Sequence, residues 1–190
     1  TLGIIRETVP EFQIEEYPSG TQVFDWTIPE EWNIREAWIK DGTGGKIIDF
    51  DWCNVHVVSY SEPVHKRMSF AELLPHLHSL PGRPAAIPYR TSYYRRSWGF
   101  CLSHRQLETL DKQAEYEVFV DADLKPGQLT LASAKLTGSD PAGSNYFVST
   151  YCCHPSLAND NLSGPILTSL LFNHLKQKRL WTTRMHYKML

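Results

Sequence analysis

The densest group of side chains that could do chemistry lies in the segment YCCHPSLANDNLSG, which covers residues 151–164. It follows an apolar stretch, residues 144–153, that the pattern predicts to be a strand covered on both faces. His154 directly follows that stretch, and Asp160 comes six positions later, immediately before a helix pattern. Because ligands in open α/β sheets collect at the carboxyl ends of strands, near helix N-termini, we expect His154 and Asp160 to lie close together.

An imidazole beside a carboxylate suits zinc or a similar divalent ion, and a carboxylate can bridge two such ions. Asn159 and Asn161 are placed to orient these ligands through hydrogen bonds. The alternative is structural, since Asp160, Asn161 and Ser163 are all good N-cap residues and a lone histidine beside a turn is usually a surface residue. The spacing alone leaves both interpretations open.

The composition excludes several classes of protein. The chain has 190 residues, 42% of them hydrophobic, which is enough for one medium domain or two small ones. A formal net charge of −2 predicts no nucleic-acid partner, and the apolar runs are too short to predict a membrane span. The N-terminal residues do not resemble a secretory signal, and the four cysteines form no CxxC pair, so we expect a cytoplasmic protein with reduced thiols.

The first hundred residues read as short strands rich in Trp, Tyr and Pro. Residues 32–40 and 46–50 flank DGTGG, which predicts a hairpin with glycines where positive φ is needed. Residues 54–61 alternate in polarity and predict a further strand. Two short helices are expected to begin with capping boxes, Ser69 with Glu72 and Ser103 with Gln106.

The second half has an α/β pattern. Residues 115–124 and 128–136 predict another hairpin, and strand 144–153 is followed by a helix over 162–178 and a strand over 182–190. Strand, helix, strand is a βαβ unit, which predicts an α/β sheet. A parallel last strand needs cover on both faces, so we expect the sequence to be the front part of a longer protein.

Four segments together resemble a known family: CHPSLANDNLSG, PSGTQVFDWTIPEEWNIREAWIKD, NVHVVSYSEPV and IPYRTSYYRRSWGFCLSH. They are similar to the DUF4910/DUF2172 aminopeptidase-like proteins, bacterial relatives of the zinc-dependent M28 peptidases that are often met beside polysaccharide-biosynthesis genes. The resemblance runs from about Tyr17 to Leu190. It implies an α/β fold with a phosphorylase/hydrolase-like (M28-type) sheet, here incomplete, interrupted by a small β-rich domain.

On this basis residues 1–24 and 104–190 are expected to form the first part of a peptidase-like domain, and residues 25–103 the inserted DUF2172-like domain. The resemblance implies one or two zinc ions in a complete family member, with His154 as a terminal ligand and Asp160 as the bridge. It places the catalytic general base and the remaining ligands downstream of the strand at 182–190. No Glu follows Glu117, so we expect no general base within the chain and weak or absent zinc binding.

The functional expectation is an aminopeptidase-like zinc metallohydrolase that acts on peptide N-termini or related amides and is inactive as this chain alone. The alternatives are a non-catalytic binding or partner protein linked to polysaccharide biosynthesis and an incomplete gene product. A homo-oligomer, or association with a missing C-terminal half, stays open. In the loop over residues 87–100, Arg90 and Tyr93 are candidates for binding substrate, against the alternative of a packed loop that covers the core.

Overall fold

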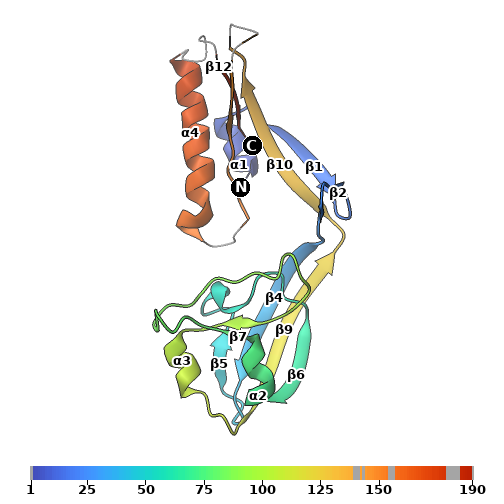
Figure 1. Ribbon diagram of the computed structural model, residues 1–190, viewed down its shortest axis with the longest axis vertical. Helices are drawn as coiled ribbons and strands as arrows, with labels where there is room; N and C mark the ends of the chain where they lie inside the picture. Colours follow the sequence, from blue (N-terminus) through green and yellow to red (C-terminus); the bar gives the residue numbers. More distant parts are fainter. Residues whose placement is uncertain (1, 139–141, 143, 154–156, 179–184, 190) are drawn as a thin grey trace. The chain divides into compact units, whose positions relative to one another are not determined.

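The computed structural model describes residues 2–138, 142, 144–153, 157–178 and 185–189. The chain divides into two compact units (Figure 1), one made of Thr1–Tyr17 with Leu129–Leu190 and the other of Pro18–Gln128. In the part of the chain that the structure describes, no helix is both long and apolar enough to cross a membrane.

The unit Pro18–Gln128 is built on a four-stranded antiparallel sheet with the order β5-β4-β9-β6. Its strands are β4 (Glu31–Lys40), β5 (Lys46–Asp49), β6 (Val64–Ser69) and β9 (Glu115–Lys125). The predicted hairpin around DGTGG is present as β4 and β5, and Gly44 in its turn has φ 85°, a conformation that favours glycine.

The core of this unit follows from the alternation of side chains along β9. Tyr116, Val118, Val120 and Ala122 lie at every second position and are all buried. They pack against the buried Ile39 and a set of residues from the connecting segments. That set includes Leu73, Leu77, Phe100 and Leu102.

The remaining elements of this unit are short. They are β2 (Gln22–Val23), β3 (Trp26–Thr27), η1 (Asn54–His56), α2 (Phe70–Leu73), η2 (Leu74–His76), β7 (Leu77–His78), β8 (Phe100–Cys101) and α3 (His104–Thr109). Both predicted capping boxes are confirmed: the Ser69 hydroxyl accepts from the Glu72 backbone N–H, and Ser103 does the same with Gln106.

Two sequence expectations differ from the structure. Residues 54–61 are not a strand: they begin with η1 and continue through isolated bridges, in which Val57 pairs with Phe100 and Ser59 with Thr91. Strand β9 does not form a hairpin with the next strand, because it lies between β4 and β6 in a different sheet. The division into peptidase-like domain (1–24 and 104–190) and inserted domain (25–103) stays a prediction.

The other unit contains a mixed sheet with the order β1-β10-β12-β11. Its elements are α1 (Leu2–Thr8), β1 (Gln13–Pro18), β10 (Gln128–Leu136), β11 (Ser144–Val148), η3 (Ala158–Leu162), α4 (Ser163–Gln177) and β12 (Met185–Met189). β11 and β12 are parallel and α4 connects them, which confirms the predicted βαβ unit, while β10 and β12 are antiparallel. The chain is therefore a mixed α/β protein.

Helices α1 and α4 pack together on one face of β10 (Figure 1). Ala132, Ala134 and Leu136 alternate along β10 and contact the core that Phe12 and Phe172 share, with ring centroids 6.4 Å apart. The apolar side chains of α4 divide into two groups: Phe172 and Leu175 are buried, whereas four others are exposed. The exposed ones are Ile166, Leu167, Leu170 and Leu171.

Candidate functional site

The candidate site lies where the chain leaves β11 and enters α4. The strand ends at Val148, five residues before the expected end, and residues 149–153 continue as irregular chain. Gly164 in the first turn of α4 approaches this segment closely: a Cβ built on it would collide with Thr150 Oγ1 and lie 3.2 Å from Thr150 Cβ. Only glycine permits that approach with Thr150 as it stands.

Asp160 and Asn161 hold the two ends of the turn together. The Tyr151 hydroxyl donates to Asp160 Oδ1 over 2.9 Å. The Cys153 backbone N–H donates to Asn161 Oδ1 over 3.2 Å, and the Asn161 side-chain amide lies 3.6 Å from the Cys153 sulfur. The peptide bond between Asp160 and Asn161 is cis. Asn161 is buried and Asp160 is exposed, so the carboxylate is the group that solvent and ligands reach.

The structure tests one of the two interpretations of Asp160 and Asn161, that of N-cap residues, whereas the metal-binding interpretation stays a prediction. The N-cap of α4 is Leu162, and it makes no side-chain capping hydrogen bond. Ser163 is the first residue of α4, and its hydroxyl donates to the Asn159 carbonyl over 2.6 Å. Asp160 and Asn161 are thus directed at the segment after β11 and do not cap α4.

The electrostatics of the turn come from the carboxylate. Burial raises the pKa of the Cys153 thiol, and the negative charges of Asp160 and Cys152 raise it further. A thiol with a raised pKa stays protonated at neutral pH and is a poor metal ligand, since the thiolate is the form that binds metals.

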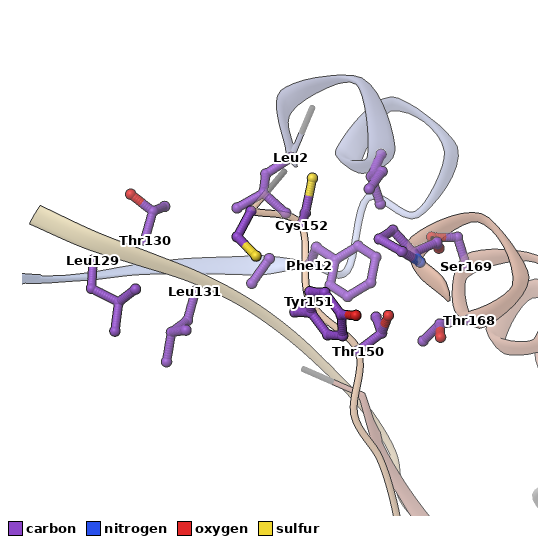
Figure 2. Close-up of a pocket in the computed structure, with 14 residues that line it drawn as sticks. Leu2, Phe12, Leu129, Thr130, Leu131, Thr150, Tyr151, Cys152, Thr168 and Ser169 are labelled. Atoms are coloured by element: carbon purple, nitrogen blue, oxygen red, sulfur yellow. The ribbon is translucent and has the colours of Figure 1, made fainter. Parts of the chain in front are cut away.

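An apolar cavity of about 200 Å³ adjoins the same segment. Figure 2 shows Thr168 and Ser169 of α4 on one side of it and Leu129 and Leu131 of β10 on the other. Tyr151, Cys152 and Cys153 also line this cavity, so it lies next to the residues that contact Asp160 and Asn161. The turn thus places a carboxylate beside an apolar space.

The structure places the predicted site residues as follows. His154 lies outside the described residues, so its proximity to Asp160 stays a prediction. Asn159 contributes its backbone carbonyl to Ser163, whereas its side chain has no assigned role. Arg90 and Tyr93 belong to the unit Pro18–Gln128, and their role in binding substrate is untested.

Sequence reasoning missed two residues of the turn, Tyr151 and Gly164. The signals that could have suggested them are a Tyr three residues before the His and a Gly directly after the Asn-Leu-Ser run.

The donor atoms that the structure describes fit zinc only in part. Asp160 offers a carboxylate oxygen, which is a suitable ligand. Zinc sites use three or four protein ligands, and the described ranges contain no group of three His, Cys, Asp or Glu side chains able to hold a metal. A zinc site here would need His154 and further donors in addition to Asp160.

The chain is similar in sequence to known proteins. Residues 31–123 match the model of DUF2172, a domain of unknown function. A protein of Clostridium acetobutylicum is 43% identical over all 190 residues, and the description of that protein names polysaccharide biosynthesis and an aminopeptidase-like domain. The chain spans 42% of the length of that relative.

Solved structures show the same fold. A crystal structure described as a peptidase from Clostridium acetobutylicum matches with a TM-score of 0.82 and 43% identity, covering 100% of this chain and 43% of that one. A zinc aminopeptidase from Bacillus subtilis matches with a TM-score of 0.58 at 12% identity, over 98% of this chain and 52% of that one. An aminopeptidase from Aneurinibacillus sp. strain AM-1 matches with a TM-score of 0.53 at 11% identity, over 98% and 55%.

The fold is therefore that of the mixed α/β proteins in these comparisons, with the low-identity likenesses supporting the fold alone. The chain contains a segment similar to DUF2172 and, over its whole length, is similar to part of a longer protein described as having an aminopeptidase-like domain. The link to DUF4910 stays a prediction.

Proposed function

We propose that this chain contributes part of the active site of an aminopeptidase-like metallohydrolase that cleaves an amino-terminal residue, or a related amide, from its substrate. One observation carries the proposal: the Asp160 side chain is held at the strand end by Tyr151 and is not used to cap α4. A carboxylate held in this way is preorganised as a ligand, because its position no longer depends on the metal.

In the proposed site His154 and Asp160 bind zinc, and Asn161 fixes the turn through its two contacts with Cys153. Zinc supplies a positive charge that polarises an amide carbonyl and makes water a better nucleophile at neutral pH. The relatives described as peptidases and zinc aminopeptidases support this assignment. The general base and the remaining ligands lie, in this proposal, outside these 190 residues.

The first test is a zinc titration of the 190-residue chain by calorimetry. We expect weak binding, because two protein ligands leave most positions of the ion to water, and we expect Asp160→Ala to abolish it. Asp111→Ala is the control, since Asp111 lies in the unit Pro18–Gln128 and should not change the binding. Equal zinc affinity in Asp160→Ala would remove Asp160 from the site.

The second test uses the protein expressed from its complete reading frame with aminoacyl-anilide substrates. His154→Ala and Asp160→Asn should abolish hydrolysis while the circular dichroism spectrum and the melting temperature stay unchanged. The 190-residue chain alone should show no hydrolysis. Zinc-dependent turnover by the chain alone would mean that a general base lies within it.

A further inference from the structure

A second cavity, of about 380 Å³, lies within the unit Pro18–Gln128 and involves none of the residues of the candidate metal site. Its size falls within the range of small-molecule pockets, roughly 300–1,000 Å³. Tyr60, Tyr93 and Tyr94 form its aromatic wall, and Glu30, Arg95 and Arg96 bring charges to it. It combines an apolar surface with a small number of polar groups, as ligand sites do.

The aromatic side chains around the cavity form a continuous cluster. Tyr93 contacts Tyr60 edge to face, with ring centroids 4.7 Å apart, and Tyr94 in the same way at 5.1 Å. Trp26 stacks on Tyr93 at 6.0 Å, and Trp32 stacks on Tyr60 at 5.8 Å. The buried end of the cluster is anchored because the Trp32 indole N–H donates to the Ser61 carbonyl over 2.9 Å.

The outer end of this cluster is open to solvent. The Tyr94 side chain is 82% exposed, and Phe24, at the tip of the hairpin that carries Trp26, is 95% exposed. Phe24 and Tyr60 are the non-glycine residues with positive φ in the described part of the chain, at 53° and 66°. Bulky residues rarely adopt that conformation, and folding gains nothing from an exposed phenylalanine in it. Two aromatic side chains at this surface are therefore accessible to a ligand.

The cavity is preformed. The Ser92 hydroxyl donates to the Tyr60 carbonyl over 2.8 Å, and the Ser92 backbone N–H donates to the Ser59 carbonyl over 2.8 Å. The Glu62 backbone N–H donates to the Ser97 carbonyl over 3.0 Å. These bonds hold the two loops that carry the aromatic wall, so binding need not order them.

The charges around the cavity balance. Arg96 pairs with Glu30 and lies 3.9 Å from Glu62, so both carboxylates contact Arg96. Taken together, these two carboxylates and the guanidinium groups of Arg95 and Arg96 carry no formal net charge. This balance disfavours a strongly charged ligand. The polar side chains of the cavity therefore act as hydrogen-bond donors and acceptors beside flat apolar rings. Such a surface suits a ligand with one apolar face and hydroxyl groups around its edge.

We propose that this aromatic cavity binds a neutral carbohydrate, with a sugar ring stacked on Tyr93 or Tyr94 and its hydroxyl groups bonded to Glu30, Arg95 and Arg96. A proline-rich peptide is the competing occupant, because such peptides also bind aromatic grooves. The charged rim favours the sugar, since proline-rich segments offer few hydroxyl groups to bond to it. This inference does not depend on the proposed hydrolase activity.

The test is ligand-observed NMR with the 190-residue protein and three neutral probes, maltotriose, cellotriose and triacetylchitotriose, each at about 10 mM to detect millimolar affinity. We expect at least one probe to bind and Tyr94→Ala to weaken it at least tenfold. Tyr94 is largely exposed, so its removal should leave the unfolding midpoint unchanged. Trp52→Ala is the matched control, because Trp52 is 60% exposed in the same unit and does not line the cavity.

Three results would overturn the proposal. The first is no binding of any probe, and the second is equal binding to the wild type and to Tyr94→Ala. The third is a proline-rich decapeptide that binds in place of the sugars and is lost in Tyr94→Ala, which would make the cavity a peptide-docking surface. Sugar binding that is lost in Tyr94→Ala and kept in Trp52→Ala would establish the site.

Discussion

The two compact units differ in how completely they bury their apolar side chains. In Pro18–Gln128, alternate residues of β9 and several residues of the connecting segments pack into a core whose members are almost fully buried. In the other unit, α4 buries Phe172 and Leu175 but exposes Leu167 by 69% and Leu170 by 58%. The unit that carries the candidate metal ligand is thus the one with the less complete core.

The two units also differ in how their polar groups are satisfied. Capping boxes and antiparallel pairing satisfy the backbone of Pro18–Gln128 locally. In the other unit the start of α4 has no side-chain cap, and Tyr151 donates to Asp160 in the turn before the helix. We infer that the first unit supplies most of the stability of the chain.

The largest expected effect is on the core of Pro18–Gln128. Phe100 is fully buried, so Phe100→Ala should lower the free energy of unfolding by about 3–5 kcal/mol. Phe147→Ala, in β11 of the other unit, is the matched control because Phe147 is 59% exposed, and its change should stay within about 0.5 kcal/mol. Urea unfolding followed by circular dichroism measures both. Equal losses of unfolding free energy in the two variants would contradict the difference between the two units.

The next effect concerns the close approach of α4 to the candidate site. Gly164→Ala should cost about 1–3 kcal/mol, because its Cβ would collide with Thr150. Thr150→Ala removes the hydroxyl that the new methyl group meets, so the double variant should recover part of the loss. A double-mutant cycle by urea unfolding measures the coupling, and strictly additive changes would contradict the contact.

The exposed face of α4 should make the chain self-associate, because contiguous exposed apolar surface favours contact between copies. Leu167→Lys or Leu170→Lys should lower the association constant about tenfold, a change of about 1.4 kcal/mol. Leu74→Lys, 43% exposed in the other unit, should have little effect. Sedimentation over a range of concentrations measures this, and a wild-type chain that is monomeric throughout would refute the expectation.

The smallest expected effect concerns the surface ion pairs of Arg35 in the unit Pro18–Gln128. Hydrogen bonds from Arg35, and then from Lys125, lower the pKa of Asp123 to about 2, and Arg35 also lowers the pKa of Asp121. A lowered pKa in the folded state adds stability above the ordinary value of 3.8, and this is lost as the pH falls from about 4 to about 2.

Arg35→Gln should therefore raise the pKa of both carboxyl groups towards the ordinary value, and the difference in melting temperature from the wild type should shrink below about pH 4. Carbon-detected NMR titration measures the two pKa values. Lys125→Gln should raise the pKa of Asp123 by less, because Arg35 is the larger cause. Unchanged values in Arg35→Gln would show that the pairs do not persist in solution.

Local signals predicted much of this fold. The glycines of DGTGG, the Ser69 and Ser103 capping boxes and the helical spacing after residue 162 each act over a few residues, and the structure contains the elements they predict. The partner of β9 could not be predicted in this way. Residues 115–124 and 128–136 look like a hairpin, but pairing with β4 and β6 buries Tyr116 and its alternating neighbours in a larger core.

For the candidate site, too, the sequence predicted some features and left others to the tertiary structure. By itself the sequence determined that a carboxylate follows an apolar strand and precedes a helix, because strand and helix periods are local properties of the chain. Whether Asp160 caps α4 or is directed at the strand end depended on Tyr151 and on the approach that Gly164 allows. The aromatic cavity joins Tyr60 to Tyr93 through loops that lie far apart in sequence. Only tertiary structure decided these contacts, because they form between segments whose separation along the chain carries no information about their distance in space.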